Sequence, residues 1–314
     1  GGAHWTKQRS GTEYPLYGVS FVGADTGTVV GEHGVILRTE TGGTTWISQR
    51  LADVVDLYAV SFPTVATGTA VGYNGVILRT SDGGGSWVKQ NSGTSSFLRA
   101  VHFSGADSGI AVGGDPSGNG VILRTTDGGA NWLLAMRDLP GMLHGIDFAD
   151  ARCVTAVGSP GMILRSTDGG ERWTTQTSPT TRPLRAVACT DASTGTVVGT
   201  IAPILDTVDG GATWTTQSDG AGVFLNGVSF SDAHTGSAVG DRGIMLRTVT
   251  GGVLSHTDAR PAPTGIRMEQ NYPNPFTRST AIRFTLGKEA YTTVSVYDLL
   301  GQRIETVQAG VLKA

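Results

Sequence analysis

The chain has 314 residues, 47 of them glycine, and a formal net charge of −3 at pH 7. This charge balance offers no basic field of the kind that binds nucleic acid. No apolar run approaches the roughly 20 residues that a membrane-spanning helix needs. The abundant glycine indicates many tight turns, because glycine adopts positive φ without a Cβ clash.

A sequence unit of about 40 residues recurs through the first 256 residues. A leucine opens each unit, at Leu16, Leu57, Leu98, Leu143, Leu184 and Leu225. A tryptophan closes five of them, at Trp46, Trp87, Trp132, Trp173 and Trp214, with spacings of 41, 45, 41 and 41 residues. A fixed period of this length is typical of solenoids and propellers.

Each unit alternates with period two. In the second unit, LYAVSF (57–62) is followed by TGTAVG (67–72), GVILRT (75–80) and WVKQ (87–90). Four short alternating segments bounded by glycine predict four β-strands, and four strands in about 40 residues are one propeller blade. The units therefore predict an all-β fold with a six-bladed β-propeller over residues 1–256.

The two ends of the repeat region bear on ring closure. The sixth unit has Ser255 where the others have tryptophan, and the chain opens on GGAHWTKQRS, the end of a unit. We expect the segment around Trp5 to pair with residues 243–248 as the fourth strand of the last blade, which would hide both sheet edges. A seventh blade is the alternative if residues that precede Gly1 are missing.

The closing phrase of each unit resembles a known repeat. TTDGGANW and STDGGERW resemble the Asp-box or BNR repeat, S/T-x-D-G-G-x-x-W, and the whole unit resembles the photosystem II assembly-factor family of propellers. Aspartate caps turns, the glycines permit the reversal, and tryptophan buries a large area. We expect a structural role for the box aspartates, Asp82, Asp127, Asp168 and Asp209, because Thr41 and Thr250 replace aspartate in the first and last units.

An arginine recurs in the third segment of five units, at Arg38, Arg79, Arg124, Arg165 and Arg247, with Asp206 in the remaining unit. One interpretation is that each pairs with a nearby carboxylate or turn carbonyl. The other is an arginine-rich surface for an acidic partner, because the photosystem relatives are thought to hold a protein client on such a patch.

One position varies while its neighbours stay fixed. It follows the opening leucine and holds Tyr17, Tyr58, Arg99, His144, Arg185 and Asn226. Because the first strand of a blade usually lines the central axis, this column is expected to form a ring at one channel mouth. Tyrosine and arginine are enriched in binding hot spots, so the ring is either a binding site or a solvated rim.

Other chemistry has little support in the sequence. The propeller has few glutamates, mostly beside turns, and glycoside hydrolysis needs two carboxylates flanking one bond. The histidines and cysteines are scattered, so no metal or cofactor is expected. Cys153 and Cys189 are expected to be free thiols, with one disulfide as the alternative. We therefore expect no enzyme, and a sialidase-like hydrolase is the least favoured function.

The repeat stops after His256. TDARPAPTG (257–265) reads as a proline-rich linker, and residues 266–314 contain two alternating segments, AIRFTL and TTVSVYDL, that predict strands. The words YPNPF and VSVYDLLGQ resemble the type A C-terminal sorting domain of the type IX secretion system of Bacteroidetes-type bacteria. That resemblance implies a partial Ig-like β-sandwich that directs export to the cell surface or outside the cell.

Two functions are favoured by these patterns. The first is a secreted or cell-surface, non-catalytic propeller that binds a protein or glycan and engages the type IX machinery through its C-terminal domain. The second is a structural subunit of an extracellular assembly, with the C-terminal domain as a joint for self-assembly. The sequence does not separate them.

Overall fold

The computed structural model describes residues 6–49, 55–200, 204–217 and 224–251, and the backbone of four strands beyond them. The chain divides into two compact units, Gly1–Val253 and Leu254–Ala314, which are taken separately below. Within the described residues, no helix is long and apolar enough to cross a membrane.

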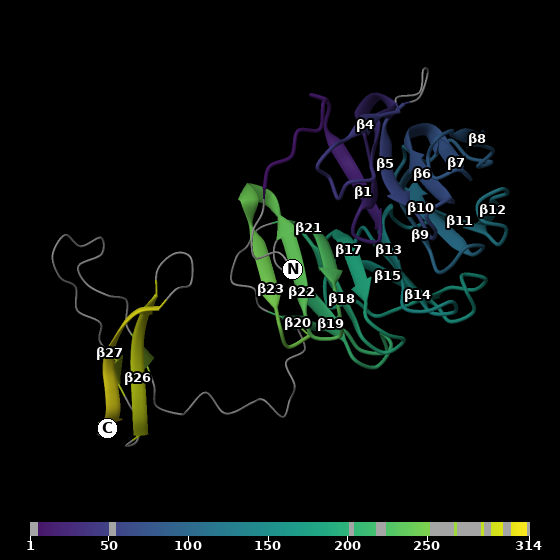
Figure 1. The fold of residues 1–314 in the computed structure, drawn as a ribbon. Coiled ribbons are helices and arrows are strands. Elements are labelled where there is room, and N and C mark those ends of the chain that lie inside the picture. The colour runs from purple at the N-terminus through teal and green to yellow at the C-terminus, as the bar shows by residue number, and fades with distance from the viewer. Residues whose placement is uncertain are drawn as a thin grey trace. The chain divides into compact units, whose positions relative to one another are not determined.

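The first unit is an all-β, six-bladed β-propeller (Figure 1). The first three blades have four antiparallel strands each. Their strands are β1 (Leu16–Val22), β2 (Thr26–Gly31), β3 (Ile36–Thr39) and β4 (Ile47–Ser48); β5 (Leu57–Ser61), β6 (Gly68–Gly72), β7 (Ile77–Thr80) and β8 (Val88–Gln90); and β9 (Phe97–Phe103), β10 (Gly109–Gly114), β11 (Gly120–Thr125) and β12 (Leu133–Leu139).

The last three blades follow the same order, and three strands of the sixth are described. They are β13 (Leu143–Phe148), β14 (Val154–Gly158), β15 (Met162–Ser166) and β16 (Thr174–Thr175); β17 (Leu184–Cys189), β18 (Gly195–Gly199), β19 (Ile204–Thr207) and β20 (Thr215–Gln217); and β21 (Leu225–Phe230), β22 (Gly236–Gly240) and β23 (Met245–Thr248). Single 3₁₀ turns, η1 (Glu32–Gly34), η2 (Tyr73–Gly75) and η3 (Asp241–Gly243), link the second and third strands in blades 1, 2 and 6.

The hydrophobic core lies between neighbouring blades. Each inner strand contacts the next along the chain, from β1 through β5, β9, β13 and β17 to β21. Between blades 1 and 2, for example, Val30 and Ile36 of one blade pack on Leu57 and Phe62 of the next. Small residues permit this approach, since a Cβ on Gly18 would lie 2.9 Å from the Cα of Ala59.

The faces of blades 1 and 6 that do not adjoin blades 2 and 5 are exposed. On β1, Val19 is 61% and Phe21 46% exposed, whereas the equivalent Val60 and Phe62 are 7% and 9% exposed. On blade 6, Val239 and Met245 are also exposed. The sequence predicts a ring closed through Trp5. That residue lies outside the described residues, so its pairing with residues 243–248 remains a prediction.

The second unit contains two antiparallel strand pairs. The short pair is β24 (Arg267–Met268) with β25 (Phe284–Thr285), and the long pair is β26 (Ala290–Tyr297) with β27 (Arg303–Leu312). The two segments predicted as strands contain β25 and most of β26. The pairs do not establish the Ig-like sandwich that the sequence resemblance implies.

Candidate binding site at the mouth of the propeller channel

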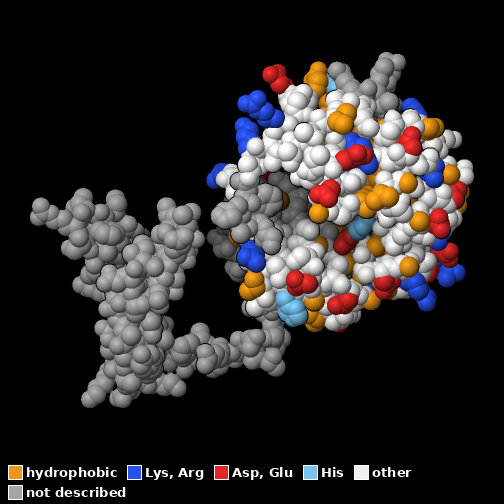
Figure 2. Space-filling model, viewed as in Figure 1, with side chains coloured by type: hydrophobic (Ala, Val, Ile, Leu, Met, Phe, Trp, Pro, Cys, Tyr) orange, Lys and Arg blue, Asp and Glu red, His pale blue; other side chains and the backbone are white. Residues whose placement is uncertain are grey.

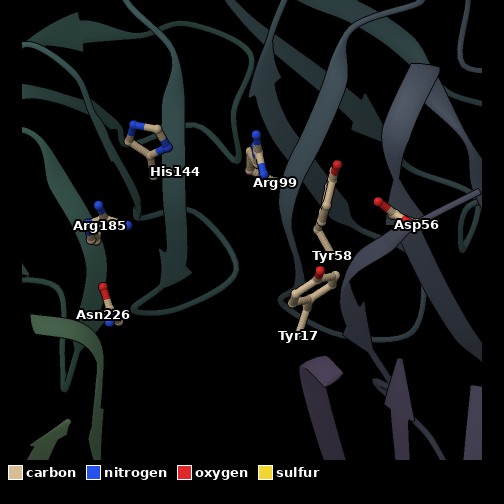
Figure 3. Close-up of a pocket in the computed structure, with 7 residues that line it drawn as sticks. All are labelled: Tyr17, Asp56, Tyr58, Arg99, His144, Arg185 and Asn226. Atoms are coloured by element: carbon tan, nitrogen blue, oxygen red, sulfur yellow. The ribbon is translucent and has the colours of Figure 1, made fainter. Parts of the chain in front are cut away.

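The variable column lies at one pocket. Tyr17, Tyr58, Arg99, His144, Arg185 and Asn226, one from each blade, line a cavity of about 540 Å³ together with Asp56 (Figure 3). Figure 3 shows His144, Arg185 and Asn226 along one side and Tyr17, Tyr58 and Asp56 along the other, with Arg99 between His144 and Tyr58. The six side chains of the expected ring therefore line one cavity, and its role as a binding site remains a prediction.

A β-bulge in each inner strand places these side chains. In blade 1, Leu16 pairs with Gly31 and Gly18 with Val30, so Tyr17 has no partner across the ladder. The register skips Tyr58, Arg99, His144, Arg185 and Asn226 in the same way. A bulged residue bends the strand and re-aims its side chain, so six identical irregularities turn six varied side chains toward the same space.

Small residues line the channel next to the ring. A second cavity, of about 260 Å³, is bordered by the ring residues and, in four blades, by the two positions that follow, such as Gly18 and Val19 or Gly145 and Ile146. At Gly145 a Cβ would lie 2.8 Å from the backbone oxygen of Arg185. Neighbouring blades are therefore closely packed at this level, and the varied side chains lie at the mouth.

Two tyrosines and an arginine form the aromatic side of the site. The rings of Tyr17 and Tyr58 have centroids 5.8 Å apart and planes 49° apart. The guanidinium of Arg99 lies over the Tyr58 ring, 4.4 Å from its centroid, a cation–π geometry. Burial raises the pKa of Tyr58 above its ordinary value, against the opposing effect of Arg99. Both phenols are therefore neutral hydrogen-bonding groups at pH 7.

His144 stands between two arginines. Burial, with added repulsion from Arg185 and Arg99, lowers its pKa to about 4, so it is neutral at pH 7. Its Nε2 lies 2.9 Å from the hydroxyl of Ser159. Within the described part of the chain, neither Arg99 nor Arg185 forms an ion pair with a carboxylate. This side of the pocket consequently carries positive charge without a compensating acid.

Asp56 joins the pocket without belonging to the variable column. It directly precedes the opening leucine of blade 2, where other blades have proline, phenylalanine or methionine. Its Oδ1 accepts the backbone N–H of His33 at 2.9 Å. Sequence reasoning missed Asp56 because it compared one position after the leucine and not the position before it. The variation at that preceding position was the available signal.

The Asp-boxes form turns away from the ring. In blade 3, Asp127 Oδ1 accepts the hydroxyl of Thr125 at 2.8 Å and the N–H of Asn131 at 2.9 Å. Thr125 in turn accepts the N–H of Gly129 at 3.0 Å. Asp82, Asp168 and Asp209 make the same contacts. These hydrogen bonds stabilise the ionised form and lower the pKa of Asp209 to about 2.

Threonine can replace the box aspartate because the turn needs only an oxygen acceptor. In blade 1, the Thr41 hydroxyl accepts the N–H of Thr45 at 3.0 Å. The box tryptophans fill the space beside the turn: Trp87, Trp132 and Trp214 are 7–9% exposed, and Trp46 and Trp173 are half-buried. These contacts are those expected of a structural corner.

The repeated arginines reach the following blade. Arg79 Nε donates to the carbonyl of Gly128 at 2.7 Å, and Arg124 Nε donates to that of Gly169 at 2.8 Å. Arg165 donates to the carbonyl of Ala192 and, at 3.0 Å, to the hydroxyl of Thr155. Each acceptor carbonyl belongs to a turn at or beside the next Asp-box. These contacts fit the turn-carbonyl interpretation of the series.

The remaining members of the series differ. Arg38 contacts Glu40 of its own blade at 3.4 Å, and Arg247 is exposed. Asp206 is buried and accepts the hydroxyl of Thr196 at 2.6 Å, while burial raises its pKa to about 6. Over the face seen in Figure 2, basic and acidic side chains are interspersed, which is not the arrangement of an arginine-rich surface.

The two cysteines and His102 lie apart from the pocket. Both Cys153 and Cys189 are free thiols, and burial raises the pKa of Cys189 to about 12. His102 Nδ1 lies 2.6 Å from Asp147 Oδ1, a contact between blades 3 and 4. Among the described residues, no group of three or more His, Cys, Asp or Glu side chains is placed to hold a metal ion.

Comparison with known proteins connects this architecture to two families. Residues 53–188 match the family described as photosynthesis system II assembly factor YCF48, and residues 270–312 match the secretion system C-terminal sorting domain. No curated protein is similar enough in sequence to match.

Two solved structures, at TM-scores above 0.5, give the same fold. YCF48 from Cyanidioschyzon merolae is 21% identical, with a TM-score of 0.60, over 88% of this chain and 96% of that one. The WD40 β-propeller domain of Doa1 is 12% identical, with a TM-score of 0.54, over 76% and 83%. YCF48 bound to D1 peptide is 22% identical over 76% and 93%, at a TM-score of 0.44. The chain joins a BNR-repeat propeller of the YCF48 type to a type IX secretion system C-terminal sorting domain, and is therefore a secreted or cell-surface protein.

Proposed function

We propose that the chain is a secreted, non-catalytic binding protein that holds its ligand in the pocket at the channel mouth. The observation that carries the proposal is the set of six β-bulges that turn the six varied side chains into one cavity. The leucine before each of them is the same in every blade, and the residue after each is glycine or alanine. A solvated rim needs no such common irregularity, and bulges are over-represented beside functional sites.

The composition of the pocket favours binding over catalysis. The aromatic pair of Tyr17 and Tyr58 and the two arginines without acidic partners are of the types that dominate binding energy. Among the residues that line the pocket, Asp56 is the one carboxylic acid. Glycoside hydrolysis uses two carboxyl groups on opposite sides of the bond, so a sialidase-like reaction lacks its second group.

A structural subunit of an extracellular assembly is the second candidate. It is favoured by the apolar faces of blades 1 and 6, where Leu16, Val19 and Met245 are 40%, 61% and 53% exposed. Exposed apolar areas of this kind often mark contact surfaces. In this alternative, residues 266–314 would complete an Ig-like sandwich with further strands and act as a joint between molecules.

Binding to ligand arrays tests the proposal. The full chain is applied to arrays of extracellular polysaccharides and peptides beside the double variant Tyr58→Ala and Arg185→Ala. We expect the double variant to lose at least tenfold in affinity, with its melting temperature little changed, because Arg185 is exposed and Tyr58 is only half-buried. Arg137→Ala is the matched control, since Arg137 is 72% exposed on the outer strand β12. Equal binding by all three proteins would contradict a ligand site at the mouth.

A further inference from the structure

We propose, on the basis of the binding function above, that the pocket takes a sugar acid such as a hexuronate. Its carboxylate would lie between Arg99 and Arg185, its ring would pack against Tyr17, and its hydroxyls would meet Asp56 and Asn226. Each part of this assignment rests on a different feature of the pocket.

The two arginines call for an anion. Arg99 Nε is buried and has no hydrogen-bond partner among the described residues, which is costly for a charged donor. Arg185 Nε has only a long contact of 3.5 Å, to the Thr200 hydroxyl. Both guanidiniums lie near enough to His144 to repel its proton. A ligand carboxylate on this side of the pocket would accept hydrogen bonds from both guanidinium groups. The planar guanidinium matches the geometry of a carboxylate well.

The aromatic side argues against a cationic group in the same ligand. Arg99 already occupies a face of Tyr58 at 4.4 Å, so a second cation on this aromatic side would be repelled. Tyr17 is 48% exposed, and its ring is tilted by 49° against Tyr58. The two rings therefore form an angled surface rather than a flat slot. The C–H face of a sugar ring is apolar enough for such a surface, and it carries no charge.

Oxygen atoms that can accept hydrogen bonds from ligand hydroxyl groups lie at the opposite edge of the pocket. Asp56 uses Oδ1 for the N–H of His33, and its second oxygen has no partner among the described residues. Asn226 donates its Nδ2 to Asp241 at 2.7 Å, which leaves its amide oxygen as an acceptor. A ligand that meets this edge must donate hydrogen bonds without bringing a carboxylate close to Asp56. Sugar hydroxyls can donate such hydrogen bonds, and the carboxylate of a uronate would lie away from Asp56, beside the two arginines.

The size of the pocket is compatible with one or two sugar rings. The cavity of about 540 Å³ falls within the range of roughly 300–1,000 Å³ typical of small-ligand sites. The ligand would stay at the mouth, because the varied polar and charged side chains lie there. An exposed position of this kind would also admit the terminal residue of an extracellular polysaccharide.

Calorimetric titration with matched sugars tests the proposal. Glucuronate and galacturonate, with their short oligomers, are compared with glucose and with oligomers whose carboxyl groups have been reduced to alcohols. We expect the full chain to bind the acids at least tenfold more tightly than the neutral forms. Arg185→Gln and, separately, Arg99→Gln should remove this preference, Asp56→Asn should weaken both classes, and Arg137→Gln should bind like the original chain. Melting temperatures show whether each variant is folded.

Two results would overturn the sugar-acid assignment. The first is equal affinity for glucose and glucuronate, and the second is unchanged uronate binding in a folded Arg185→Gln variant. If a neutral glycan or a peptide binds and the Tyr58→Ala and Arg185→Ala double variant abolishes that binding, the pocket function stands and the ligand class is wrong. If no ligand binding depends on the pocket, both proposals fail together.

Discussion

The indole of Trp132 meets the ring of Phe103 edge-on, with centroids 6.0 Å apart and planes at 87°. Trp87 with Phe62 and Trp46 with Phe21 repeat this arrangement at 5.8 and 6.3 Å, also at 87°. The phenylalanine comes from the inner strand and the tryptophan from the box of the same blade. The box therefore acts in packing as well as in turning the chain, and its two roles can be separated by mutation.

Trp132→Ala should lower the free energy of unfolding by about 3–5 kcal/mol, as for other large truncations in a core. Asp127→Ala should cost less, about 1 kcal/mol, because it removes a turn cap and leaves packing in place. Denaturant unfolding of the two variants measures both values. A larger loss for Asp127→Ala than for Trp132→Ala would show that the turn, and not the packing, dominates the box.

Arg124→Met should destabilise the propeller by about 1–3 kcal/mol, the usual range for hydrogen bonds of charged groups. The change keeps an apolar stem but leaves the carbonyl of Gly169, which Arg124 now contacts at 2.8 Å, without its donor. Arg137→Met on the exposed strand β12 is the control. Urea unfolding of both should reveal a clear difference, and indistinguishable midpoints would mean that the contact between blades contributes nothing measurable.

Asp206→Asn should raise the melting temperature at pH 7 and have little effect near pH 4. Burial raises the pKa of Asp206 from 3.8 to about 6 in the folded chain. The folded state therefore favours the protonated acid, and the penalty for ionising it is complete above about pH 6 and fades as the pH falls toward 3.8. Asparagine keeps an oxygen for Thr196 and carries no charge. A variant less stable than the original at pH 7 would contradict this.

His144 should titrate near pH 4 when its ring resonances are followed by NMR. Its folded pKa lies below the ordinary 6.5, so the stability that comes from the neutral ring is complete above about pH 6.5 and is lost as the pH falls toward 4. Arg185→Gln should raise this pKa, because a repelling charge is removed. An unchanged titration in that variant would contradict a contribution from Arg185 and leave burial and Arg99 as the causes of the shift.

Removing residues 257–314 should leave a folded, monomeric propeller with a nearly unchanged melting temperature. The division of the chain at Val253 and Leu254 is the basis for this expectation. Light scattering of the full and shortened chains at high concentration then tests whether residues 266–314 join one molecule to another. Self-association of the full chain alone would support this role, and a full chain that stays monomeric would contradict it. A shortened chain that cannot fold would contradict the division into two units.

Much of the fold can be read from the sequence because one pattern is written six times. The period near 40 and the alternation within each unit predict the strands of the blades, and variation beside fixed leucines identifies the ring. The bulges at Tyr17 and its equivalents could not be predicted, since they depend on register across a ladder. The reach of Arg124 to the next blade also depends on the angle between sheets, which no local pattern contains.

The same limit explains what was missed in the site. Asp56 enters the pocket through a loop that precedes its strand, and the neutral state of His144 arises from burial together with two arginines from other blades. These are properties of the assembled ring. The position of the Asp56 carboxylate likewise depends on its contact with the backbone of His33 in the neighbouring blade, a contact between residues 23 positions apart.

The arginine contacts from one blade to the next make the propeller a row of coupled units, each held mainly by its immediate neighbours. In such a row, stability is a sum of unit and nearest-neighbour contributions, and opening begins where a neighbour is lacking. Among the described residues, blades 1 and 6 each pack on a single neighbouring blade and have exposed apolar faces. Backbone amides should consequently exchange with deuterium fastest in blades 1 and 6 and slowest in blades 3 and 4. Local unfolding would then begin in blades 1 and 6 and proceed toward the middle of the row.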